Sequence, residues 1–241
     1  MLYFQTIMSH LLRQETTTPG SVEECILDSY GDRELQLIRR VDWRFLFPEP
    51  ALRRVAYVGS RDEVLLAALG RFSESLTVFS QQDLAAIPEP ENHDFDLVIM
   101  RSRLRGDLET AVSLLRVGGY FYWEIDRRNW LSFKRKARAG PRFPIFSDYV
   151  GFLKPLGFSE IGLQWHFPNF EMCRQMVPLD DPVALGYVLR ANNGRALRLK
   201  TFLGCRPRIL ILLRWLLPCI SITAKKIKDF NKEREQDSCL R

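Results

Sequence analysis

Short apolar runs typical of buried strands alternate with segments of helical periodicity through the middle of the chain. The apolar runs lie at 54–59, 75–80, 94–102, 117–126 and 159–167, with a last one at 219–226. The segments with helical spacing lie between them, at 62–72, 106–116 and 147–158. Strands that alternate with helices predict an α/β domain with a parallel sheet and right-handed crossovers.

The segments on either side of this alternation have other patterns. Residues 21–41 carry apolar positions at helical spacing and predict one or two short helices with Gly31 as a break. Residues 42–50 place four large apolar side chains before two prolines, which indicates a docking segment at a core edge. Residues 208–218 are apolar but contain Arg214, and a bilayer span needs about 20 residues. We interpret them as a helix on the sheet or, alternatively, a membrane-surface contact.

Composition narrows the class of protein. With 241 residues and 46% hydrophobic content, the chain can form one domain with appendages. The net charge of +6 permits an acidic partner, although an ordinary solvated surface explains it as well. Five scattered cysteines without a CxxC pair, and three histidines, indicate no metal cluster and a reducing compartment. We therefore expect a cytoplasmic protein, membrane-peripheral if 208–218 contacts lipid.

Four stretches resemble the class I S-adenosylmethionine-dependent methyltransferases. Residues 55–63 (VAYVGSRDE) fall where this family has its first glycine motif, V-L-D-x-G-x-G, and 94–100 (DFDLVIM) resemble its fourth strand. Residues 114–125 (LLRVGGYFYWEI) resemble the turn into strand five. Residues 157–165, followed much later by 220–226, resemble strands six and seven. The resemblance covers about residues 40–226. It implies a Rossmann-like, doubly wound, mostly parallel sheet with an antiparallel last strand and a helical cap insertion.

This resemblance also implies a division of the chain. The expected parts are an N-terminal extension (1–40), a Rossmann-like core (41–167), a cap insertion (168–207), a final helix and strand (208–226) and a charged tail (227–241). The cap should cover the carboxyl edge of the sheet, where it could enclose a ligand. Between residues 80 and 94 the chain is short for the family's helix and third strand, so one of them should be truncated or absent.

The cofactor that the resemblance implies is S-adenosylmethionine, bound beyond the carboxyl ends of the strands. The positions that would hold it are Val58, Gly59, Ser60, Arg61, Ser80, Gln81, Asp83 and Arg101. The chain departs from the family pattern twice, because Ser60 and Arg61 follow Gly59 and no acid ends the second strand. Together these changes should weaken cofactor binding by roughly 10²–10³-fold. As a loop residue, Gly59 should tolerate substitution without loss of stability.

Two side chains at this edge are candidate general bases, His166 and Asp126. Packing among aromatic neighbours is the alternative for His166, and an ion pair with Arg127 or Arg128 is the alternative for Asp126. No motif for a metal, a P-loop or a nucleophilic elbow is present.

The function that follows from the resemblance is methyl transfer from S-adenosylmethionine to a small molecule or biosynthetic intermediate. The alternative is a domain that kept the fold, lost the cofactor and serves as a non-catalytic binding or scaffold partner in a biosynthetic complex. Expected partners are therefore a small-molecule substrate or a biosynthetic partner protein. Nucleic acid is disfavoured, although residues 127–142 mix basic and aromatic side chains. The sequence does not indicate an oligomeric state.

Overall fold

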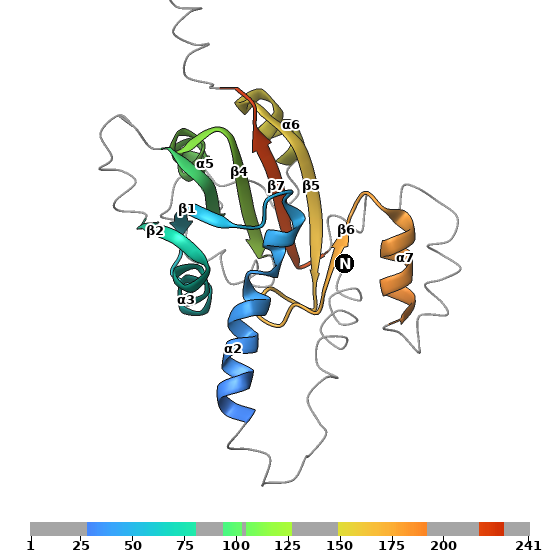
Figure 1. Ribbon diagram of the computed structural model, residues 1–241. Helices are drawn as coiled ribbons and strands as arrows, with labels where there is room; N and C mark the ends of the chain where they lie inside the picture. The colour runs from blue at the N-terminus through green and yellow to red at the C-terminus, as the bar shows by residue number, and fades with distance from the viewer. Residues whose placement is uncertain (1–27, 81–93, 103–104, 127–148, 192–216, 229–241) are drawn as a thin grey trace, which may run out of the picture.

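A seven-stranded mixed sheet forms the centre of the molecule (Figure 1). The computed structural model describes residues 28–80, 94–102, 105–126, 149–191 and 217–228. The strands are β1 (Leu52–Gly59), β2 (Ser73–Phe79), β3 (Phe95–Arg101), β4 (Leu115–Asp126), β5 (Phe158–Phe167), β6 (Gln175–Pro178) and β7 (Cys219–Lys226). Their order across the sheet is β2-β1-β3-β4-β7-β5-β6.

The strand directions confirm the expected Rossmann-like fold. β1 pairs in parallel with β2 and β3, and β3 pairs in parallel with β4. β7 lies between β4 and β5 and is antiparallel to both, so β5 runs in the same direction as β4. The expected truncation before β3 falls at 81–93, outside the described residues.

Helices cover both faces of the sheet, as doubly wound folds require. On one face, α3 (Glu63–Phe72) packs with Trp43 and Phe47 against Val55, Tyr57 and Ile99 of the strands. On the other face, α5 (Arg105–Leu114) and α6 (Tyr149–Leu153) pack against alternate residues of β1, β3 and β4. The predicted helix 62–72 is confirmed, and the predicted helix 106–116 ends earlier because β4 begins at Leu115.

The N-terminal helix corrects one prediction. α2 (Asp28–Arg40) is continuous through Gly31, where a break was expected. A glycine inside a helix costs only about 1 kcal/mol, which the packing of the helix can offset. Its last turn is held in place because Arg40 and the following Val41 are buried. The short helix η1 (Asp42–Leu46) then docks Trp43 into the core, as the sequence predicts for this segment.

The segment after β5 contains a strand, β6, that the sequence pattern does not predict. β6 pairs antiparallel with β5 and extends the sheet at that end. It is only four residues long, too short for a clear alternating pattern. α7 (Pro182–Ala191) follows, and Leu185 and Val188 pack with Trp165 and Val177. Figure 1 shows α7 beyond β6, away from β1.

Two further predictions concern helices near the end of the core. The helix expected at 147–158 is α6 followed by the 3-10 helix η3 (Lys154–Leu156), and Gly157 ends it with φ +83°. Residues 208–216 of the apolar segment 208–218 lie outside the described residues. Leu217, which is described, is buried. None of the helices in the described ranges is long and apolar enough to cross a bilayer.

Candidate functional site

The strand order reverses between β1 and β3, and their carboxyl ends meet there at Gly59 and Arg101. Crevices at such points are where open α/β sheets bind ligands. Gly59 has a φ of +137°, and a Cβ on it would lie 2.8 Å from the Arg101 carbonyl carbon. Glycine is therefore required here by the close approach of the two strands, as well as by the backbone conformation.

Four charged side chains form an ion-pair cluster at this edge: Arg40, Asp62, Arg101 and Glu124. Arg40 Nη1 and Nη2 donate to Glu124 Oε1 and Oε2 at 2.6 and 2.7 Å. Arg40 Nη2 also lies 3.1 Å from Asp62 Oδ2. Arg101 donates to Asp62 through Nη1, and its Nε lies 3.1 Å from Glu124 Oε2. Two arginines and two carboxylates make the cluster neutral.

The cluster has a closed side and an accessible side. The side chains of Arg40 and Glu124 are 1% and 0% exposed, whereas those of Arg101 and Asp62 are 15% and 12% exposed. Arg40 comes from the last turn of α2 and Glu124 from inside β4, so packing immobilises both. Asp62 is the N-cap of α3, where its Oδ1 accepts from Leu65 N at 3.0 Å. The accessible pair is thus Asp62 Oδ2 and the Arg101 guanidinium.

The electrostatics keep these groups ionised. Burial raises the pKa of Asp62, but the Leu65 N–H and the two arginines outweigh it, and the net pKa is lowered. Burial alone would lower the pKa of Arg40, yet the Glu124 carboxylate more than compensates and raises it.

Tyr57 lies next to the cluster and stays neutral, because burial raises its pKa to about 12. The hydroxyl of Tyr57 donates to the Ser60 carbonyl and so shapes the turn after β1.

His166 lies beside the cluster but does not suit the role of general base. Its side chain is buried and packs against Phe170, with the two ring centroids 4.7 Å apart. Its Nε2 lies 2.7 Å from Ser221 Oγ. Burial, helped by the Arg40 charge, lowers its pKa to about 3. A base works best with a pKa near the operating pH. The alternative given above, a histidine packed among aromatic side chains, describes this position better.

The other predicted site residues that the structure describes lie at or next to the carboxyl edge of the sheet. Val58 is buried in the sheet, while Ser60, Arg61 and Ser80 are exposed at the carboxyl edge. Gln81 and Asp83 lie outside the described residues. Asp126 is half-buried at the end of β4, opposite Cys219 of β7. The described ranges hold no group of His, Cys, Asp or Glu side chains that could bind a metal ion.

Three members of the cluster were not among the predicted site residues. Glu124 had a usable signal, because an acid inside a buried aromatic strand requires a charged partner. Asp62 had a weaker one, since an acid at the start of a helix pattern indicates an N-cap. Arg40 had no local signal, because its partner Glu124 is 84 positions away.

Comparisons with known proteins return remote structural likenesses. Neither a family model nor a curated protein sequence matches the chain. A methyltransferase of Thermotoga maritima that uses S-adenosylmethionine is 14% identical, with a TM-score of 0.41 over 91% of this chain and 99% of that one. Phosphoethanolamine N-methyltransferase 2 of Haemonchus contortus, solved with S-adenosylhomocysteine, is 12% identical with a TM-score of 0.41. There the match covers 83% of this chain and 53% of that one.

The plantazolicin methyltransferase BpumL, solved with S-adenosylhomocysteine, is 9% identical with a TM-score of 0.40 over 94% of this chain and 96% of that one. Likenesses at this level carry no conclusion about activity or substrate. The assignment of the fold rests on the strand order itself, with β7 antiparallel between β4 and β5.

Proposed function

We propose that the carboxyl edge binds S-adenosylmethionine and that the domain transfers its methyl group to a small molecule. The observation that carries this proposal is the accessible ion pair at the switch point, Arg101 with Asp62. The methionine half of the cofactor carries one carboxylate and one ammonium group. A guanidinium and a carboxylate side by side are the complementary pair for such a zwitterion.

The described residues fit this half of the cofactor. Arg101 can exchange Asp62 for the ligand carboxylate, and Asp62 Oδ2 can accept from the ligand ammonium. Asp62 Oδ1 keeps its bond to Leu65 N, so α3 stays capped. Arg40 Nε is buried without a hydrogen-bond partner among the described residues, which leaves one further donor in the cluster. The ribose of the cofactor would lie near the end of β2. The described residues there end at Ser80 and include no acid that could accept from the ribose hydroxyls.

The division of labour within the protein follows from these contacts. Arg40 and Glu124 hold Arg101 in position, while Arg101 and Asp62 contact the ligand. When bound, S-adenosylmethionine supplies an activated methyl group on its sulfonium. His166 is assigned no proton transfer, because it is buried and neutral at physiological pH.

Titration calorimetry with S-adenosylmethionine and S-adenosylhomocysteine tests the proposal. We expect a Kd on the order of 0.1–1 mM for the native chain, given the weakened turn and missing ribose acid. Asp62→Asn keeps an N-cap residue but removes the charge, and should weaken binding about tenfold to hundredfold. The matched control is Asp96→Asn at the opposite edge, where Asp96 pairs with Arg54 and Arg116. Affinity that is unchanged in Asp62→Asn would overturn the assignment.

A second candidate function is favoured by the same cluster. Each of its four charges already has a partner within the chain, so the edge is complete without a ligand. This is what a non-catalytic methyltransferase-like domain would have, acting as a binding or scaffold partner in a biosynthetic complex. Absence of heat at millimolar S-adenosylmethionine would favour this function over methyl transfer.

A further inference from the structure

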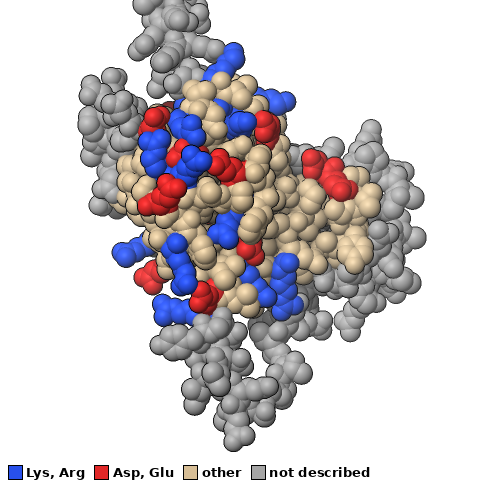
Figure 2. Space-filling view, viewed as in Figure 1, with Lys and Arg blue, Asp and Glu red and all other residues tan. Residues whose placement is uncertain are grey.

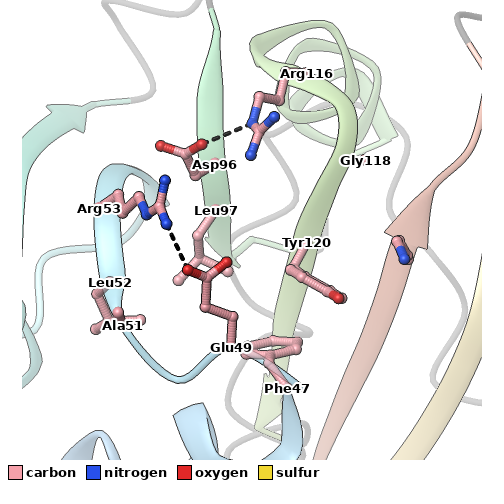
Figure 3. A pocket seen from close by; sticks show the side chains of 11 residues that line it. Phe47, Glu49, Ala51, Leu52, Arg53, Asp96, Leu97, Arg116, Gly118 and Tyr120 are labelled. Carbon is pink, nitrogen blue, oxygen red and sulfur yellow. Dashed lines mark hydrogen bonds and ion pairs between the residues drawn. The ribbon is translucent and has the colours of Figure 1, made fainter.

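A cavity of about 150 Å³ lies at the amino edge of the sheet, away from the switch point. The segment from Phe47 to Ala51 forms one wall, and the starts of β1, β3 and β4 form the other (Figure 3). Figure 2 shows basic and acidic side chains close together at the upper left of this face and again along its lower part. The cavity is lined by Phe47, Glu49, Ala51, Leu52, Arg53, Asp96, Leu97, Arg116, Gly118, Tyr120 and Lys225.

The charges of this cavity favour an anion. Three basic side chains, Arg53, Arg116 and Lys225, line it together with two acids, Glu49 and Asp96. The net charge of the lining is therefore +1. A concave site with an excess of positive charge concentrates anions.

The hydrogen-bonding groups point to the same class of ligand. Asp96 is already occupied, because its Oδ1 forms an ion pair with Arg116 Nε at 2.7 Å and its Oδ2 accepts from Arg54 N and Nε at 3.1 and 3.3 Å. The closest contact of Arg116 with Asp96 is through Nε, and its guanidinium donates no hydrogen bond within the described ranges. Lys225 Nζ is 3.7 Å from its nearest acid, Glu160, and makes no hydrogen bond within the described ranges. Arg53 is paired with Glu49 at 2.5 Å, so the donors left for a ligand are those of Arg116 and Lys225.

An aromatic surface adjoins these donors. The rings of Phe47 and Tyr120 are 4.8 Å apart, and Lys225 Nζ lies 5.7 Å from the Tyr120 ring centroid. Figure 3 shows both rings beside the cavity, below Arg116. A flat apolar group attached to an anion could contact these rings while its oxygens accept from Arg116 and Lys225.

We infer that this amino-edge cavity is a second binding site, for the phosphate group of a small aromatic or apolar phosphate monoester. The inference does not depend on the proposed function, since the residues involved belong to the opposite edge of the sheet. It assigns Arg116 and Lys225 to the phosphate oxygens, and Tyr120 with Phe47 to the attached group.

The test is calorimetric titration of the full chain at low ionic strength with inorganic phosphate and with phenyl phosphate. We expect millimolar binding of phosphate and about 3- to 10-fold tighter binding of phenyl phosphate, because the ring adds a contact. Lys225→Gln and Arg116→Gln should each weaken both ligands at least fivefold. Tyr120→Leu should remove the advantage of phenyl phosphate and leave phosphate binding unchanged.

The matched control is Arg71→Gln, which removes the same charge from α3, where Arg71 pairs with Glu34. Equal weakening in Arg71→Gln and Lys225→Gln would show a net-charge effect and overturn the site. Undetectable phosphate and phenyl phosphate binding at 20 mM would overturn it as well. Lys225→Gln keeps the test independent of folding, because this change leaves the Arg116–Asp96 pair intact. Asp62→Asn should bind phosphate normally, which separates this site from the carboxyl edge.

Discussion

At the scale of single residues, Gly59 has a different role from the one that its place in the motif suggests. From its place in the motif, Gly59 is expected to be a loop residue whose substitution leaves stability unchanged. The structure contradicts this, because Gly59 is buried, is the last residue of β1 and contacts the backbone of Arg101. A substitution there would disturb the sheet as well as any ligand, so it cannot report on ligand binding alone.

Gly59→Ala should lower the free energy of unfolding by about 2–4 kcal/mol, because the new Cβ adds a clash to an unfavourable φ. Urea denaturation followed by circular dichroism measures this change. Gly70→Ala is the control, since Gly70 lies in α3 with nothing within 4 Å of an added Cβ. That variant should gain about 0.5–1 kcal/mol. Equal effects of the two changes would contradict the explanation.

His166 should make stability depend on pH. Its pKa is lowered to about 3 in the folded protein and is near 6.5 when unfolded. Above pH 6.5 both states are neutral at this residue and stability is unaffected. Between pH 6.5 and 3 the unfolded state binds the proton and the folded state does not, so stability falls with decreasing pH. From pH 7 to pH 5 the expected loss is about 2 kcal/mol.

Urea denaturation at both pH values measures the effect. In His166→Gln, which can still hydrogen-bond to Ser221, this part of the pH dependence should disappear. An unchanged slope would mean that another group is responsible. Asp62 does not interfere in this range, because its lowered pKa costs stability only as the pH falls below about 4.

At the scale of elements, a buried lysine ties the last strand to a helix on the sheet. Lys226 ends β7, and its Nζ donates to the carbonyl oxygens of Val112 and Leu115 at 3.0 and 2.7 Å. These carbonyls lie at the end of α5 and the start of β4. A cation at a helix C-terminus satisfies the last carbonyls and interacts favourably with the helix dipole.

Lys226→Met should therefore destabilise the protein by about 1–3 kcal/mol, since buried carbonyls lose their donor. The neighbouring Lys225→Met is the control, because Lys225 is partly exposed and points to the other face. Its effect should stay within about 0.5 kcal/mol. Hydrogen exchange of α5 should accelerate in Lys226→Met. A variant as stable as the control would contradict this role.

At the scale of the whole molecule, the ion-pair cluster connects segments that are distant in sequence. It joins α2, the turn after β1, the end of β3 and β4 through Arg40, Asp62, Arg101 and Glu124. Removing one partner of a buried pair leaves an uncompensated charge, whereas replacing both with neutral groups costs much less.

Arg40→Met should cost about 3–5 kcal/mol, and the double variant Arg40→Met with Glu124→Gln should regain part of that loss. Arg71→Met is the matched control, because Arg71 makes an exposed ion pair with Glu34 and should lose less than about 1 kcal/mol. Urea denaturation of the four proteins completes the comparison. If Arg40→Met cost no more than the control, the cluster would not be a structural link.

The sequence alone was sufficient for six of the seven strands, for most helices and for the antiparallel last strand. The strands and helices depend on local apolar periodicity, which is visible in short windows, and the direction of the last strand follows from the order of motifs along the chain. Where a signal was short or weak, prediction failed, as with the four-residue β6 and the continuity of α2 through Gly31.

The candidate site required the tertiary structure. Position in a motif indicated Gly59 and Arg101 at the carboxyl edge, but it could not show that Gly59 contacts the Arg101 backbone. Likewise, Arg40 acquires its role from Glu124, 84 positions away, and His166 its low pKa from burial below Phe170. Secondary structure follows largely from the residues near each position, whereas charge pairing and burial depend on which distant segments the fold brings into contact.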